Sequence, residues 1–353
     1  MRSGKSLAVA VAVVCAAAVA AFGAPAADAG IATPLRILPV HPHHAKPAKP
    51  RPKRPAAPAK ARATVPAAPT APSQVVPDDP AWPQEWSLAR IGAPQAWALA
   101  RGTRPVVVAV VDSGVDPSQP DLQGALVPGA DFADSTGSTA DQFGHGTMVA
   151  GVIAARGNNG QGVAGACWSC LVMPIKVLDA NGTGTAGAIA QGIRWAAEHG
   201  ANVINMSFVL SGPDGDVEAA IAYAHQLGVV VVAAAGNSGG SEPTYPASYP
   251  FVVSVAATDE ADHLYSWSSR GAWVTVAAPG CTVTTALGGG FGPFCGTSAA
   301  APLVAGLAGL AYEAGAASAD EVAVALAQTS AALPGAVANG RVDALQLIRR
   351  FTP

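Results

Sequence analysis

The stretch ANVINMSFVLSGPDGDVEAAIAYAHQLGVVVVAAAGN, residues 201–237, decides the fold. Its two ends, 201–208 and 229–237, are short and largely apolar without regular alternation, and the segment 216–228 between them has helical character and ends at a glycine. Continuous apolar runs predict strands that are buried on both faces of a sheet. A helix between two such strands predicts a parallel crossover, the building unit of a doubly wound α/β fold.

The same alternation continues on both sides of this stretch. Further strands are predicted at 105–112, 172–179 and 251–258, and further helices at 146–155, 186–200, 298–315, 318–330 and 341–350. The fold class is therefore α/β, with a doubly wound, mostly parallel sheet and helices on both of its faces. In such sheets, functional sites lie at the carboxyl ends of the strands.

The charge distribution divides the chain into two unlike parts. The whole chain has 353 residues and a formal net charge of −3. Residues 1–77 contain ten of the twenty basic residues and a single acid, Asp28, so the remainder is strongly acidic. The acidic part excludes nucleic-acid binding by bulk charge, and the low cysteine content excludes a disulfide scaffold.

The composition of the first 77 residues predicts an export signal followed by a linker. Residues 1–29 have a basic start, an apolar middle and small residues at the end, as in a secretory signal peptide; an uncleaved membrane anchor is the alternative. Residues 30–77 contain twelve prolines and no aromatic residue, which predicts a disordered basic linker able to touch an anionic envelope surface. The globular domain is expected over 78–353, secreted or held in the periplasm or cell envelope.

Three reactive side chains occupy the places where a site is expected. Asp112 ends a predicted strand, His145 begins a helix between two glycines, and Ser298 begins the long apolar helix. A serine hydroxyl becomes a useful nucleophile when a base removes its proton, and the base needs an orienting carboxylate. Asn237 follows another strand, where its amide can donate a hydrogen bond to an oxyanion.

These segments, VVDSGVD, FGHGTMVAG, AAAGNSG and CGTSAAAP, resemble the signatures of the subtilisin-like serine proteases. The stretch 77–97 is similar to the thermitase-like branch of that family. The resemblance implies an endopeptidase that cleaves polypeptides through an acyl-enzyme intermediate. Asp112 would then be the orienting residue, His145 the general base, Ser298 the nucleophile and Asn237 the oxyanion donor. A lipase on an α/β-hydrolase fold is excluded, because Gly-x-Ser-x-Gly is absent around Ser298.

The resemblance also implies a substrate site, in which two residues depart from the family pattern. Val209 stands where a glycine normally admits the substrate backbone, and Thr244 stands where the floor of the specificity pocket is often glycine. Small or medium apolar side chains are therefore expected in the pocket. The residues assigned to substrate binding are Ser207, Phe208, Val209, Ala235, Gly236 and Thr244.

A structural Ca²⁺ ion is a further implication of the resemblance. Calcium takes six to eight oxygen ligands, and the loop 155–165 resembles the family's calcium loop. The alternative is an ordinary Asn-Gly loop that binds no ion. The residues assigned as ligands are Asp79, Asp121, Gly157, Asn159, Gln161 and Val163.

Four cysteines remain once Cys15 leaves with the signal peptide. Cys167 and Cys170 are interpreted as a small structural disulfide, with a redox pair or half of a zinc site as alternatives. Cys281 would then pair with Cys295 and close the loop that leads to the nucleophile. Four cysteines allow three pairings, and the sequence alone does not choose among them.

Two further departures bear on function. Ala299 follows the nucleophile where the family commonly has an oxidation-sensitive methionine, so peroxide should not inactivate the enzyme at that position. Residues 30–77 are too short and too rich in proline to form the folded inhibitory propeptide of the family, so none is expected there. Together with Val209 and the basic linker, this gives the rival hypothesis of a catalytically silent binding module tethered to the envelope. A monomer is expected in either case.

Overall fold

The computed structural model describes residues 10–12, 74–100, 105–134, 136–333 and 337–352. The predicted signal peptide therefore lies outside the described residues except for Ala10–Ala12, which form the short strand β1. The predicted linker lies outside them except for its last four residues.

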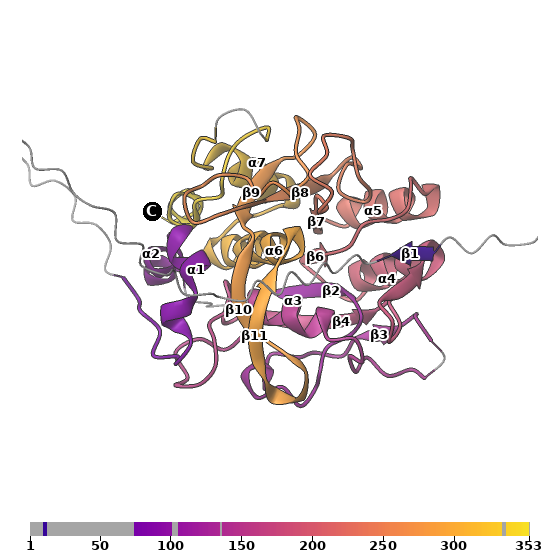
Figure 1. The fold of residues 1–353 in the computed structure, drawn as a ribbon, viewed down its shortest axis with the longest axis horizontal. Coiled ribbons are helices and arrows are strands. Elements are labelled where there is room, and N and C mark those ends of the chain that lie inside the picture. The colour runs from indigo at the N-terminus through magenta and orange to yellow at the C-terminus, as the bar shows by residue number, and fades with distance from the viewer. Residues whose placement is uncertain (1–9, 13–73, 101–104, 135, 334–336, 353) are drawn as a thin grey trace, which may run out of the picture. The chain divides into compact units, whose positions relative to one another are not determined.

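A parallel sheet of seven strands forms the centre of the described domain (Figure 1). Every neighbouring pair in it is parallel, with the strand order β3-β4-β2-β6-β7-β8-β9. The predicted doubly wound α/β fold is confirmed. In this spatial order the strands are Ala130–Asp131, Leu171–Lys176, Val107–Asp112, Val203–Met206, Val230–Ala234, Val252–Thr258 and Val276–Pro279.

Helices cover both faces of the sheet. Successive residues of a strand point to opposite faces, so each strand contributes side chains to two cores. Val108 and Val110 of β2 belong to the larger core with helices α3 (His145–Ala154) and α6 (Thr297–Ala314). Their neighbours Ala109 and Val111 belong to a second core with α4 (Ala186–Glu198) and α5 (Gly215–Gln226). This explains why the strands carry apolar residues on both faces, with only single buried polar residues such as Asn205 and Ser254 between them.

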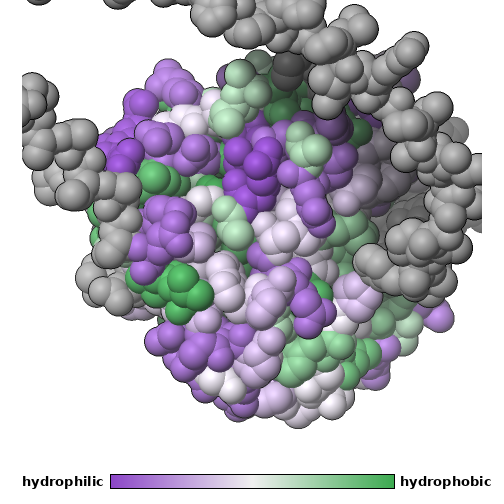
Figure 2. All heavy atoms as spheres, turned by 60° about the vertical axis from the view of Figure 1, so that its left-hand side comes forward, coloured by the Kyte–Doolittle hydropathy of each residue, from purple (hydrophilic) through white to green (hydrophobic). Residues whose placement is uncertain are grey.

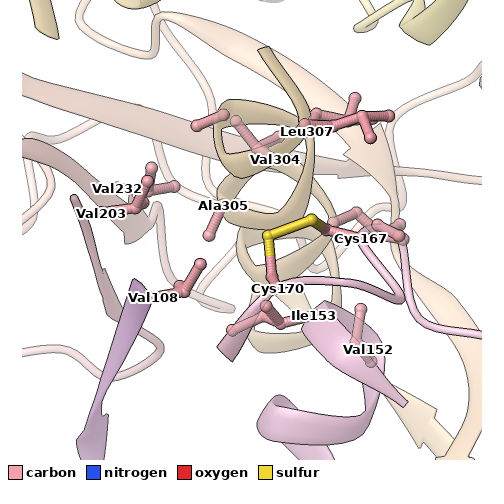
Figure 3. Close-up of a cluster of buried hydrophobic side chains, with 14 of the residues drawn as sticks. Val108, Val152, Ile153, Cys167, Cys170, Val203, Val232, Val304, Ala305 and Leu307 are labelled. Atoms are coloured by element: carbon pink, nitrogen blue, oxygen red, sulfur yellow. A yellow bond between two sulfur atoms is a disulfide. The ribbon is translucent and has the colours of Figure 1, made fainter. Parts of the chain in front are cut away.

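Helix α6 lies in the larger core, beside the Cys167–Cys170 disulfide (Figure 3). A Cβ atom added at Gly309 would stand 2.6 Å from Cys170 Sγ, so the helix approaches the disulfide closely only because this residue is a glycine. The helix that begins at the candidate nucleophile thus rests on a covalently closed turn.

Several elements were not predicted from the sequence. Besides β3 and β9, they include β5 (Thr183–Thr185), the antiparallel hairpin of β10 (Cys281–Thr285) and β11 (Phe291–Cys295), and the helices α1 (Trp86–Arg90) and α2 (Ala93–Leu99). The hairpin passes across α3 in Figure 1. The predicted helices near the end of the chain are α7 (Ala319–Gln328) and α8 (Ala344–Arg349). The remaining elements are short turns of 3-10 helix, η1 (Trp82–Gln84), η2 (Pro120–Leu122) and η3 (Leu287–Gly289).

Polar and apolar side chains are interspersed on the face of the described residues that Figure 2 presents. Among the described helices, none alone has the length and apolar character to cross a membrane. Helices α6 and α7 reach that length and composition only as a pair, with a bend of 116° between them.

Candidate active site

Asp112 and His145 form a buried pair at the carboxyl end of β2. Asp112 is the last residue of that strand, and His145 is the first residue of α3. The Nδ1 atom of His145 lies 2.9 Å from both carboxylate oxygens of Asp112. The two residues are 0% and 3% exposed, so the pairing is shielded from water. A carboxylate in this position orients the imidazole and stabilises its protonated form.

Ser298 is fixed by an exchange of hydrogen bonds with Ser207. Its Oγ donates to the Ser207 carbonyl oxygen at 2.8 Å. In return, Ser207 Oγ donates to the Ser298 carbonyl oxygen at 3.2 Å and accepts from the amide of Asn205. Residue 302 would normally donate to that carbonyl within the helix, but Pro302 has no N–H. The proline therefore frees a backbone acceptor at the nucleophile, and Ser207 satisfies it.

Two nitrogen atoms converge on the space beside Gly296. A Cβ atom added there would lie 3.4 Å from Asn237 Nδ2 and 3.5 Å from the backbone nitrogen of Ser298. Asn237 is oriented because its Oδ1 accepts from both the backbone N–H and the hydroxyl of Thr297, at 2.9 and 3.0 Å. Asn237 Nδ2 and the Ser298 backbone nitrogen therefore lie near one another, and two neighbouring N–H donors are what an oxyanion site requires.

The strand β5 follows Gly182, where an added Cβ atom would lie 2.7 Å from the ring of Phe143, two residues before His145. No sequence pattern marked this strand. Residues Ala10–Ala12 of the same chain pair with it antiparallel, in the register Ala10 to Thr185 and Ala12 to Thr183. The edge therefore accepts an extended segment through backbone hydrogen bonds, which is a common way to bind peptides.

The six residues assigned to substrate binding do not all face the site. Ser207 touches the nucleophile, as described above. The side chain of Phe208 is 2% exposed and belongs to the second hydrophobic core, so any contact of this residue with a substrate is through its backbone. The apolar environment of that core holds the aromatic ring, and only its backbone remains for contact.

Val209, Ala235, Gly236 and Thr244 do lie together. A Cβ atom added at Gly236 would stand 3.3 Å from a methyl group of Val209 and 3.6 Å from that of Thr244. The hydroxyl of Thr244 donates to the Ala235 carbonyl oxygen at 2.7 Å, which fixes the position of the methyl group. The side chains of Val209 and Thr244 thus narrow the space over Gly236. Glycine at position 209 or 244 would leave this space wider.

Two further residues beside the pair were missed. Phe294 of β11 meets the His145 ring edge to face, with 5.4 Å between the ring centres. Asp141 accepts hydrogen bonds from the first turn of α3 and from Ser113. An acidic residue a few positions before a predicted helix is a signal for such a cap, whereas nothing local in the sequence places Phe294 against His145.

The predicted calcium ligands gather around two buried carboxylates. Asp79 is 2% exposed and Asp121 is 0% exposed, and burial raises the pKa of both carboxyl groups. Asp79 accepts from the backbone N–H groups of Asn158 and Asn159, and Asp121 accepts from the backbone N–H of Val163 and the amide of Asn159. No described basic side chain forms an ion pair with either carboxylate. Buried acids without a cationic partner suit a hard cation such as calcium. In this arrangement, however, N–H groups of the loop face both carboxylates, and Asn159 turns its amide nitrogen rather than its oxygen toward Asp121.

Two other predicted ligands, Gln161 and Gly157, differ in their surroundings. Gln161 is exposed, and its backbone N–H donates to Asn159 Oδ1. Gly157 packs so closely on Trp168 that an added Cβ would lie 2.7 Å from the indole. The sequence analysis missed Glu85, a third buried acid whose carboxylate accepts from the Ala164 backbone N–H at 3.0 Å.

Both disulfides are closed in the structure. Cys167 is bonded to Cys170, and Cys281 is bonded to Cys295. The second bond joins facing residues of β10 and β11, one residue before Gly296. It therefore closes the hairpin immediately before Gly296 and Ser298.

Comparisons with known proteins identify the family of the chain. A model of the Subtilase family matches residues 103–346. The Thermophilic serine proteinase of Bacillus sp. (strain AK1) is 46% identical over 204 residues, covering 58% of this chain and 51% of that protein. Thermitase of Thermoactinomyces vulgaris is 40% identical over 246 residues, covering 69% of this chain and 88% of that protein.

A solved protease structure from Pseudoalteromonas arctica matches with a TM-score of 0.73 and 31% identity, covering 79% of this chain and all of that one. The matched part spans about half the length of the Bacillus proteinase and most of the length of thermitase. The chain therefore belongs to the subtilase family of serine proteases and is thermitase-like within it.

Proposed function

We propose that this chain is a serine endopeptidase that hydrolyses peptide bonds through an acyl-enzyme intermediate on Ser298. The observation that carries the proposal is that Asn237 Nδ2 and the Ser298 backbone nitrogen lie side by side at Gly296, 3.4 and 3.5 Å from where its Cβ would stand. Two neighbouring N–H donors next to a candidate nucleophile suit an oxyanion, and a protein that only binds peptides has no chemical need for them. The buried pairing of Asp112 with His145 supports the same reaction.

The residues divide the work as follows. Ser298 Oγ attacks the substrate carbonyl carbon, and its proton passes to His145 as general base. Asp112 stabilises the imidazolium that forms, through the Nδ1–H bond. The carbonyl oxygen becomes an oxyanion and accepts from Asn237 and from the Ser298 backbone N–H. His145 then protonates the departing amine, and a water molecule releases the acyl group by the reverse sequence of proton transfers.

The substrate is an extended polypeptide that pairs with β5 as an added strand. The antiparallel pairing of Ala10–Ala12 with this edge supports that mode. The methyl groups of Val209 and Thr244 beside Gly236 narrow the space for the side chain before the cleaved bond. We expect small apolar residues there, and a Thr244→Gly variant should accept larger ones. Its ratio of kcat/KM for a phenylalanine substrate over an alanine substrate should rise about tenfold or more.

A calcium ion would be held by the carboxylates of Asp79 and Asp121 with oxygens of the 157–163 loop. Its chemistry here is structural, because it supplies positive charge to two buried acids that have no basic partner among the described side chains. A tighter fold of the loop beside α3 is the expected consequence.

The chain acts outside the cytoplasm, as a monomer. Residues 1–29 export it, 30–77 form a basic spacer that can rest on an anionic envelope surface, and 78–353 form the peptidase domain. Two disulfides in the domain fit an oxidising compartment.

The test is labelling with a fluorophosphonate probe, which reacts with activated serines. We expect the wild-type protein to be labelled in calcium-containing buffer and a Ser298→Ala variant to remain unlabelled. Cleavage of an unstructured protein such as casein, measured in parallel, should follow the labelling. A folded, calcium-loaded wild type that is neither labelled nor active would favour the silent binding module instead.

A further inference from the structure

We propose that Asp141 is a positioning residue that locks the Asp112–His145 pair in its reactive geometry. The inference rests on the proposed function and adds to it a residue outside the reacting set. Asp141 lies four residues before His145 and is 8% exposed. It forms no ion pair with a described basic side chain. Its role must therefore come from its hydrogen bonds.

Both carboxylate oxygens of Asp141 are fully engaged by donors. Oδ1 accepts from Ser113 Oγ at 2.8 Å and from the backbone N–H groups of Phe143 and Gly144 at 2.9 and 2.8 Å. Oδ2 accepts from the backbone N–H and the hydroxyl of Thr147, at 2.9 and 2.6 Å. Hydrogen bonds to an ionised acceptor are shorter and stronger than neutral ones. One buried side chain thus holds the turn before His145 and the first turn of α3.

The contact with Ser113 connects this cap to the other half of the pair. Ser113 follows Asp112 directly, and its backbone N–H donates to Asp112 Oδ1 at 2.8 Å. Its hydroxyl donates to Asp141 and accepts from the backbone N–H of Gly146, the residue after His145, at 3.0 Å. Hydrogen bonds of Ser113 therefore connect the end of β2, next to Asp112, with the turn before His145 and with Gly146 after it.

These hydrogen bonds matter because the chain between Asp112 and His145 does not by itself hold the two residues together. The helix begins after Gly144, which has a φ of +99° and contributes no side-chain cap. Asp112 and His145 are separated by 33 residues, so their approach depends on tertiary contacts. A small displacement of a reacting group lowers catalysis by about 10²-fold.

The experiment compares Asp141→Asn with the wild type and with Asp214→Asn. Asparagine keeps the shape, but one of its ends is an NH₂ group that must face donors, because both oxygens of Asp141 accept. Asp214 is a matched control: it caps α5 through the backbone N–H groups of Asp216 and Val217, on the other face of the sheet. Three quantities are measured: kcat and KM on a peptide substrate, the rate of fluorophosphonate labelling, and the far-downfield NMR resonance of the proton shared by His145 and Asp112.

We expect Asp141→Asn to lower kcat by about 10²-fold and to leave KM within about twofold, with labelling slowed in parallel. The shared-proton resonance should shift or broaden, while Asp214→Asn should lower only the Tm. A folded Asp141→Asn variant with the wild-type kcat and resonance would overturn the proposal, because Asp141 would then be a helix cap alone.

Ser113→Ala covers the case in which Asp141→Asn does not fold. It removes the side-chain hydrogen bonds of Ser113 and leaves the backbone cap of α3 intact, so a kcat lower by about tenfold with a shifted resonance is expected, and unchanged values refute the proposal. Failure of the proposed function is separately visible, since the wild type itself would then not be labelled. The resonance would still decide the role of Asp141 in that case.

Discussion

Replacing Glu85 by glutamine should change how the stability of the calcium-free domain depends on pH. Glu85 is 1% exposed, and burial raises the pKa of its carboxyl group to about 8. The nearby charges of Asp79 and Asp121 raise the pKa further, while the hydrogen bond from the Ala164 backbone opposes these effects. The carboxyl group is therefore held in its neutral form through most of the physiological range.

The sign of the effect follows from proton binding. The folded pKa lies above the unfolded one, so between these two values the folded state keeps a proton that the unfolded state has released. Stability is fully present below the unfolded pKa and falls as pH rises toward about 8. The difference from the ordinary value of 4.5 corresponds to about 5 kcal/mol as an upper value, at 1.36 kcal/mol for each pKa unit. Asp79 and Asp121, also raised by burial, add in the same direction.

The assay is urea unfolding from about pH 5 to about pH 9 in excess EDTA, followed by tryptophan fluorescence. A Ser298→Ala background prevents self-digestion. The parent should lose several kcal/mol across this range, and the Glu85→Gln variant should lose much less. Calcium should flatten the parent curve, because a bound cation offsets the buried negative charge.

Glu321→Gln is the matched control, since this glutamate is exposed on α7 and its replacement should leave the curve of the parent unchanged. The reasoning is refuted if Glu85→Gln keeps the full pH dependence of the parent in EDTA.

Three further predictions concern the active site. Asn237→Ala should lower kcat by about 10²–10³-fold with little change in KM, a scale measured for the corresponding donor of a subtilisin, a relative of this chain. Steady-state kinetics test this, and an unchanged kcat would exclude Asn237 from the oxyanion site. Replacing Cys281 and Cys295 together by serine should lower the free energy of unfolding by about 3 kcal/mol, since the disulfide spans 14 positions. Urea unfolding measures this free energy, and a loss near zero would contradict a stabilising role of the disulfide. Ala299→Met should make activity sensitive to hydrogen peroxide while the wild type resists, as residual activity after exposure would reveal; equal loss in both proteins would place the damage elsewhere.

The sequence by itself predicted five of the seven strands of the sheet and the candidate reactive residues. The strands β2, β4, β6, β7 and β8 are recognisable because a strand buried on both faces is largely apolar, and this leaves a run without polar alternation. Asp112, His145 and Ser298 are recognisable because they follow or begin such elements, in segments that resemble one family. Both signals are local, and a local signal is readable from one chain segment.

The tertiary structure decided what depends on contacts between distant segments. The sequence places Phe208 beside the nucleophile's partner Ser207, yet its ring lies in the core. Phe294 reaches His145 only because the β10–β11 hairpin crosses α3. Asp141 connects the segments of Asp112 and His145 through Ser113, and Glu85 shares its charge environment with Asp79 and Asp121. Burial and hydrogen-bond partners are properties of the packed chain, so no local pattern of residue types encodes them.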